Sequence, residues 1–71
     1  MKYDTLHIND FTEPELQYFR DTCNFSEEEL ICFNMRAKNK SIVEMAFAIH
    51  CSEAKVSKLI KKVKTKMKRV L

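Results

Sequence analysis

Eight basic side chains lie in the last eighteen residues of this 71-residue chain, and no acidic side chain lies among them. They are Lys55, Lys58, Lys61, Lys62, Lys64, Lys66, Lys68 and Arg69. Cationic groups in this number can neutralise phosphates and release the counterions that surround nucleic acids. A solvated helix face is the plain alternative, but a complete lack of acids is unusual for one. The pattern therefore favours contact with nucleic acid.

The two halves of the chain carry opposite charge. Residues 1–35 hold two basic and eight acidic side chains, whereas residues 36–71 hold eleven basic and two acidic ones. The net charge of +3 thus hides a cationic pole that attracts polyanions and an acidic pole that repels them. Most acids of the first half fall in the first turns of predicted helices, where the helix dipole favours them. A protein-docking face is the alternative explanation for these acids.

Four helix starts position these charges. Thr12, Ser26 and Ser41 are each followed three residues later by Glu, which matches the capping box. Ser52 is a fourth cap, and the Glu53 that follows suits the positive helix end. These signals predict four helices over about 12–23, 26–38, 41–49 and 52–70.

The connections between these helices are short, and the chain has no glycine to close them. Asn39 and His50 stand where a left-handed residue is needed, and we expect some strain at His50. Small Ala46 is expected to face Val56 where two helices cross closely. We predict a compact all-α bundle of four short helices, with a C-terminal helix-turn-helix and a long basic last helix. Residues 1–11 are expected to form an arm and residues 12–71 a single domain.

Two segments carry a family resemblance: ELICFNMR at 29–36 and SIVEMAFAIHCSEAKV at 41–56. With them, residues 26–71 resemble the C-terminal, promoter-reading domain of bacterial sigma factors, and are similar to the LuxR-type DNA-binding domain. The chain departs from the pattern at Asn39 and His50, where Gly is usual, and at Lys55, where Thr is usual. The resemblance implies transcriptional regulation, with the last helix in the major groove of double-stranded DNA. The other sigma-factor domains do not occur in this sequence, so we expect a stand-alone regulator.

Candidate DNA contacts follow from the resemblance and the helical spacing. Outward positions early in the last helix are the candidates for base reading: Glu53, Ala54, Ser57, Lys58 and Lys61. Positions near helix starts and on the basic stretch are the candidates for phosphate contact: Lys38, Lys40, Ser41, Ser52, Lys55 and Lys62. Glu53 has an equally good plain explanation, because a carboxylate stabilises a helix N-terminus.

An apolar stripe at heptad spacing continues to the end of the last helix. Its first members, Val56, Ile60 and Val63, are expected to seal the domain's own core. Its last members, Met67 and Val70, extend with Leu71 past the expected body, and these three residues are candidates for a homodimer contact. A dimer would fit paired DNA half-sites.

Other chemistries lack the residues that they need. The three cysteines, Cys23, Cys32 and Cys51, are odd in number and lack the C-x-x-C spacing of zinc sites and redox motifs. There is no glycine-rich phosphate loop, and a chain of this length does not easily shape a deep pocket. We therefore predict no enzymatic activity, no metal and no cofactor.

The absence of an apolar stretch of about 20 residues, and of a signal-peptide core, predicts a cytoplasmic protein without a membrane partner. Two alternatives to a transcriptional regulator remain open. One is a protein-interaction module that binds RNA polymerase or another regulator. The other is a phage or mobile-element accessory protein that acts through DNA.

Overall fold

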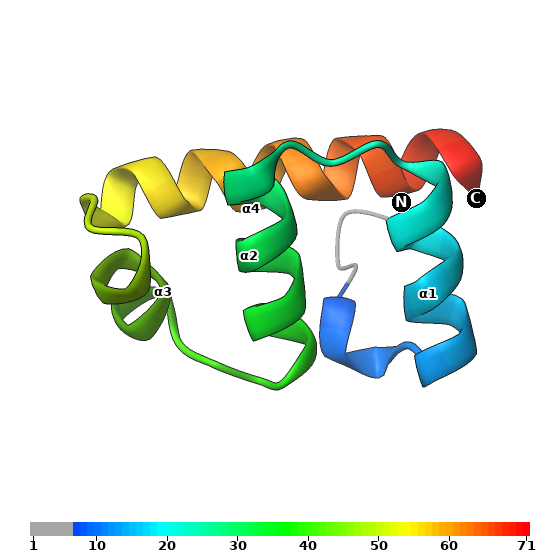
Figure 1. The fold of residues 1–71 in the computed structure, drawn as a ribbon, viewed down its shortest axis with the longest axis horizontal. Helices are drawn as coiled ribbons and strands as arrows, with labels where there is room; N and C mark the ends of the chain where they lie inside the picture. Colours follow the sequence, from blue (N-terminus) through cyan, green and yellow to red (C-terminus); the bar gives the residue numbers. More distant parts are fainter. Residues whose placement is uncertain (1–6) are drawn as a thin grey trace.

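The computed structural model describes residues 7–71, which form four α-helices and one short 3-10 helix and contain no strand (Figure 1). The elements are η2 (Ile8–Asp10), α1 (Glu13–Thr22), α2 (Glu27–Ala37), α3 (Ile42–Ala48) and α4 (Glu53–Val70). The prediction of a compact all-helical fold is confirmed. Each helix begins one residue after the predicted position because the hydroxyl residue there is the N-cap.

The N-caps satisfy backbone amides that the first turn of each helix would leave unpaired. Ser26 and Ser41 form complete capping boxes, in which the serine hydroxyl accepts from the amide three residues on. The glutamate at that position accepts from the serine's own amide at 2.9 Å. At Thr12, both the amide and the hydroxyl donate to the Glu15 carboxylate. Because each cap stabilises its helix by about 1 kcal/mol, these residues set where the helices begin.

Left-handed residues follow three of the helices. Asn24, Asn39 and His50 have φ values of 54°, 63° and 54°. The predictions for Asn39 and His50 are confirmed, whereas Asn24 was not predicted. The short polar side chain of asparagine makes this conformation accessible, and histidine adopts it at a greater cost.

The long helix α4 spans the molecule (Figure 1). Its 18 residues correspond to about 27 Å of helix, and the longest dimension of the molecule is 30 Å. The other helices pack along it, with α3 near its start, α2 across its middle and α1 near its end. The position of α4 is therefore set by its packing against the other three helices.

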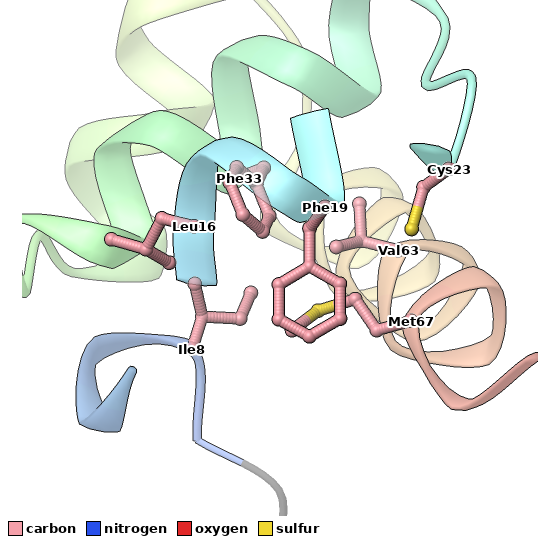
Figure 2. Packing of buried hydrophobic residues seen from close by; sticks show 7 residues of the cluster. All are labelled: Ile8, Leu16, Phe19, Cys23, Phe33, Val63 and Met67. Carbon is pink, nitrogen blue, oxygen red and sulfur yellow. The ribbon is translucent and has the colours of Figure 1, made fainter. Parts of the chain in front are cut away.

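Two groups of buried side chains form the core. The aromatic cluster gathers residues of η2, α1, α2 and the second half of α4 around two phenylalanines (Figure 2): Ile8, Leu16, Phe19, Cys23, Phe33, Val63 and Met67. The turn cluster gathers residues of α2, α3 and the first half of α4: Cys32, Met45, Ala46, Val56 and Leu59. The neighbouring α2 residues Cys32 and Phe33 thus enter different clusters.

Part of the predicted N-terminal arm belongs to the aromatic cluster. Ile8 is 1% exposed, and the partly buried Phe11 packs beside it. The rings of Phe11 and Phe19 meet edge to face at 5.0 Å. Residues 1–6 of the predicted arm lie outside the described residues.

The expectation of an uncovered apolar tail is wrong for Met67. Met67 is completely buried because η2 and α1 cover the second half of α4. Val70 is partly buried on the same cluster, and its carbonyl accepts a hydrogen bond from the Tyr18 hydroxyl at 3.4 Å. Leu71 is 52% exposed. The homodimer stays a prediction, and of its three candidate residues Leu71 alone is well exposed.

Candidate nucleic-acid interface

The outer side of the first half of α4 is open to solvent. The five candidates for base reading are all exposed: Glu53, Ala54, Ser57, Lys58 and Lys61. Val56 and Leu59, which alternate with them along the helix, point into the turn cluster. Because residues three and four apart share one side of a helix, Ala54, Lys58 and Lys61 form a continuous outer surface.

α3 and the turn after it hold this part of α4 in place. Ala46 and Val56 are 6% and 0% exposed within the turn cluster, so a small side chain stands where the two helices pack. At the turn, His50 is left-handed, and the Cys51 amide donates to the Ala46 carbonyl at 3.0 Å. Ser52 then caps α4 by accepting from an amide of its first turn. These bonds set the direction in which α4 leaves α3.

The six candidates for phosphate contact are exposed but do not form one group. Three of them belong to the α2–α3 connection, which lies at the end of α2 farther from α4 (Figure 1): Lys38, Lys40 and Ser41. The other three lie on α4 or cap it: Ser52, Lys55 and Lys62. The hydroxyls of both serines already accept cap hydrogen bonds, which leaves their hydrogens for donation to a phosphate.

Two lysines of α4 reach towards acidic residues of α2. Lys55 lies 3.5 Å from the Glu28 carboxylate, and both side chains are about half exposed. Lys66 donates to the Glu29 carboxylate at 2.5 Å and to the Asn24 carbonyl at 3.3 Å. The sequence reasoning missed these pairs, which place Lys55 beside an acid of its own chain. An exposed pair such as Lys55 and Glu28 contributes little stability.

Glu29 is the one charged side chain among residues 7–71 that is buried, at 5% exposure. Burial works to raise the pKa of Glu29. The hydrogen bond from Lys66, the hydrogen bonds at Ser26 and the positive charge of Lys66 outweigh that effect, so the pKa lies below its usual value. Glu29 therefore stays ionised, closes the capping box of α2 and holds Lys66.

A cationic cavity of about 420 Å³ runs along α4 from Lys58 to Arg69, and we call it the lysine groove. Its lining combines five basic side chains with Thr65 and Glu29; the basic ones are Lys58, Lys61, Lys62, Lys66 and Arg69. Among the ion pairs of residues 7–71, none involves Lys58, Lys61 or Lys62. The spacing 58, 62, 65, 69 marks one side of the helix. Thr65 was therefore readable from the sequence but was not predicted, and Arg69 was counted among the basic residues of the last helix without being a specific phosphate candidate. The groove brings several cations close together, an arrangement that suits an anionic ligand.

The cysteines are all reduced, and two of them are buried. Burial raises the pKa of the Cys32 and Cys23 thiols, which keeps both groups protonated and unreactive. The Cys51 thiol donates to the Ser52 carbonyl at 3.4 Å. Among residues 7–71, no three histidine, cysteine or acidic side chains are grouped so that they could hold a metal ion.

Comparisons with known protein families, curated proteins and solved structures give no match for this chain. None of the helices described for residues 7–71 combines the length and apolar character needed to cross a bilayer.

Proposed function

We propose that this protein binds double-stranded DNA as a transcriptional regulator, with α3 and α4 acting as a helix-turn-helix. The observation that carries the proposal is the outer side of α4, where exposed polar and basic residues lie opposite a buried apolar side. α3 supports that surface from behind. A cationic helix about 10 to 12 Å wide fits the major groove of B-DNA, which is about 12 Å wide.

Two sets of contacts have different roles in this proposal. Ala54, Ser57 and Lys58, near the start of α4, meet the base edges, with Ala54 suited to a thymine methyl and Lys58 to guanine acceptors. The residues of the lysine groove beyond Lys58, such as Lys62 and Arg69, bind phosphates and set the register on the duplex. Sequence preference thus resides in the first half of α4, and salt-dependent affinity in the second.

A comparison of two charge reversals tests the proposal. Lys58→Glu and Lys64→Glu change the net charge equally, but Lys58 is on the outer side whereas Lys64 is partly buried at its flank. Using a site selected from random DNA, we expect Lys58→Glu to weaken binding by at least about tenfold and Lys64→Glu by much less. Fluorescence anisotropy measures the affinities, and circular dichroism verifies that both variants keep their helices. If both variants lost the same DNA affinity, binding would depend on overall charge alone, and the proposal would be wrong.

The salt dependence gives a second measurement on the same DNA. The logarithm of the wild-type affinity should fall linearly with the logarithm of the salt concentration, and Lys62→Ala should reduce the slope by about one. Lys55→Ala should change the slope less, because Lys55 already lies beside Glu28. A flat response in the wild type would contradict phosphate binding.

A further inference from the structure

A second cavity, of about 590 Å³, lies between α3 and the start of α4, and we call it the α3 groove. Val43 and Phe47 line it, one helical turn apart on α3, and Glu44 and Glu53 line it as well. It shares no lining residue with the lysine groove.

The two apolar residues of the α3 groove are unusually exposed. Phe47 is 85% exposed and Val43 is 60% exposed, the largest values for big hydrophobic side chains within residues 7–71. Single exposed hydrophobic residues are common on protein surfaces and need no explanation. Here two of them share one side of a helix and one cavity, which makes a contiguous apolar patch of the kind that marks interaction sites.

The charge of the α3 groove is opposite to that of its surroundings. Residues 36–71 contain eleven basic residues, and their only two acids, Glu44 and Glu53, both line this groove. Hydrogen bonds from Ser41 hold the pKa of Glu44 below its usual value, so its carboxylate stays charged. Lys40 lies 4.0 Å from that carboxylate, but both side chains are about half exposed and such a pair is weak.

We propose that the α3 groove docks a segment of a partner protein in which an apolar side chain is flanked by lysine or arginine. The apolar side chain would cover Phe47 and Val43, and the flanking cations would lie against Glu44 and Glu53. DNA fits this groove poorly, because the two carboxylates repel phosphates. The basic helix of a second copy also fits poorly, because its apolar residues are buried in its own core: Val56, Leu59, Val63 and Met67.

Synthetic peptides with a leucine–phenylalanine core test the proposal by amide chemical-shift titration of the whole chain. The lysine-flanked peptide should bind saturably and shift the amides of Val43, Phe47 and Glu53. A glutamate-flanked peptide and a lysine-flanked peptide with an alanine core should bind at least about tenfold more weakly. Shifts confined to other parts of the chain, or equal binding of the lysine- and glutamate-flanked peptides, would overturn the proposal.

Substitutions in the groove separate its apolar and charged contributions. Phe47→Ala should weaken the lysine-flanked peptide by about tenfold or more, as expected for an aromatic anchor. Glu44→Gln keeps the capping box, because glutamine also caps, and should weaken the peptide by about threefold. Ile31→Ala, at an exposed apolar residue of α2 outside the groove, is the matched control and should leave binding unchanged.

Two further measurements distinguish other occupants of the groove. If Phe47→Ala lowered DNA affinity as strongly as Lys58→Glu, the groove would face DNA and the proposal would be wrong. If sedimentation velocity showed a wild-type dimer that Phe47→Ala dissociates, the occupant would be a second copy. We expect a wild-type sedimentation coefficient that Phe47→Ala leaves unchanged. The peptide titration contains no DNA, so failure of DNA binding would leave its result intact.

Discussion

The two halves of α4 belong to one continuous helix but are held in different ways. The second half packs into the aromatic cluster, where Val63 and Met67 meet side chains from η2, α1 and α2. The first half packs into the turn cluster, where Val56 and Leu59 meet α3 and Cys32. Aromatic rings fill the aromatic cluster, whereas small and flexible side chains such as Ala46 and Met45 fill the turn cluster.

This difference indicates a division of labour along the helix. Large rings that meet edge to face, such as Phe19 and Phe33 at 6.4 Å, bury much apolar area and anchor α4 to the body. In the turn cluster the small side chain of Ala46 lets α3 pack closely against α4, and the outer side of this half of α4 is exposed. Both clusters thus contribute to stability, and the first half of α4 also presents the candidate interface.

The largest expected effect on stability comes from replacing one buried methionine in each cluster with alanine, which leaves a cavity. Met67 and Met45 are both completely buried, and replacing either with alanine should cost about 2–5 kcal/mol of unfolding free energy. In hydrogen exchange, Met67→Ala should first expose amides of α1, whereas Met45→Ala should first expose amides of α3. Urea unfolding measures the stability loss. If both variants opened the same amides first, the two halves would form one inseparable unit.

A smaller effect is expected at the contact between α2 and α4. Glu29→Gln keeps the cap but removes the buried negative charge that pairs with Lys66. We expect the free energy of unfolding to fall by about 1–3 kcal/mol. Glu28→Gln removes the exposed pair with Lys55 and should cost less than about 0.5 kcal/mol. Chemical denaturation of both variants at neutral pH gives the comparison. Equal losses would contradict the difference in burial.

The same contact predicts a pH dependence. The pKa of Glu29 is lowered in the folded state, so its contribution is fully present above the unfolded-state value of about 4.3. It is lost as the pH falls from there through the lower pKa of the folded protein. Wild-type stability should therefore decline more steeply below about pH 4.3 than that of Glu29→Gln. Parallel declines would show that Glu29 does not contribute.

The smallest effect is expected at the turns. His50→Gly removes the cost of a left-handed histidine and should stabilise the protein by about 0.5–1 kcal/mol, after the added freedom of glycine in the unfolded chain. Asn39→Gly should stabilise it less, because asparagine tolerates this conformation better. Thermal unfolding measures both changes. A lower melting temperature for His50→Gly would show that the imidazole makes a stabilising contact.

Local signals in the sequence sufficed for the helices. Ser26 and Ser41 allowed the starts of their helices to be predicted, because the capping box involves residues only three positions apart. Asn39 and His50 were identified because a chain without glycine has few residue types suited to a left-handed turn. Asn24 escaped notice, although it fills the corresponding position after α1.

Features that depend on distant parts of the chain could not be predicted from these signals. The periodicity of α4 shows that Met67 is on the apolar side, but not that η2 and α1 cover it. The charges of Lys55 and Lys66 are obvious in the sequence, but their pairing with α2 requires the three-dimensional arrangement of the helices. The exposed candidates at the start of α4 were predictable, because helical spacing alone places them opposite Val56.

Helix α2 contributes to both clusters, because Phe33 packs in the aromatic cluster and the neighbouring Cys32 in the turn cluster. The resemblance predicted from the sequence covers only residues 26–71, whereas η2 and α1 lie before this stretch and cover Phe33, Val63 and Met67. In a shortened polypeptide starting at Ser26, the apolar side chains of Phe33, Val63 and Met67 would be exposed to water. We expect this exposure to loosen α2, which also packs against the turn cluster through Cys32. We therefore expect residues 26–71 to be much less stable on their own than within the whole chain.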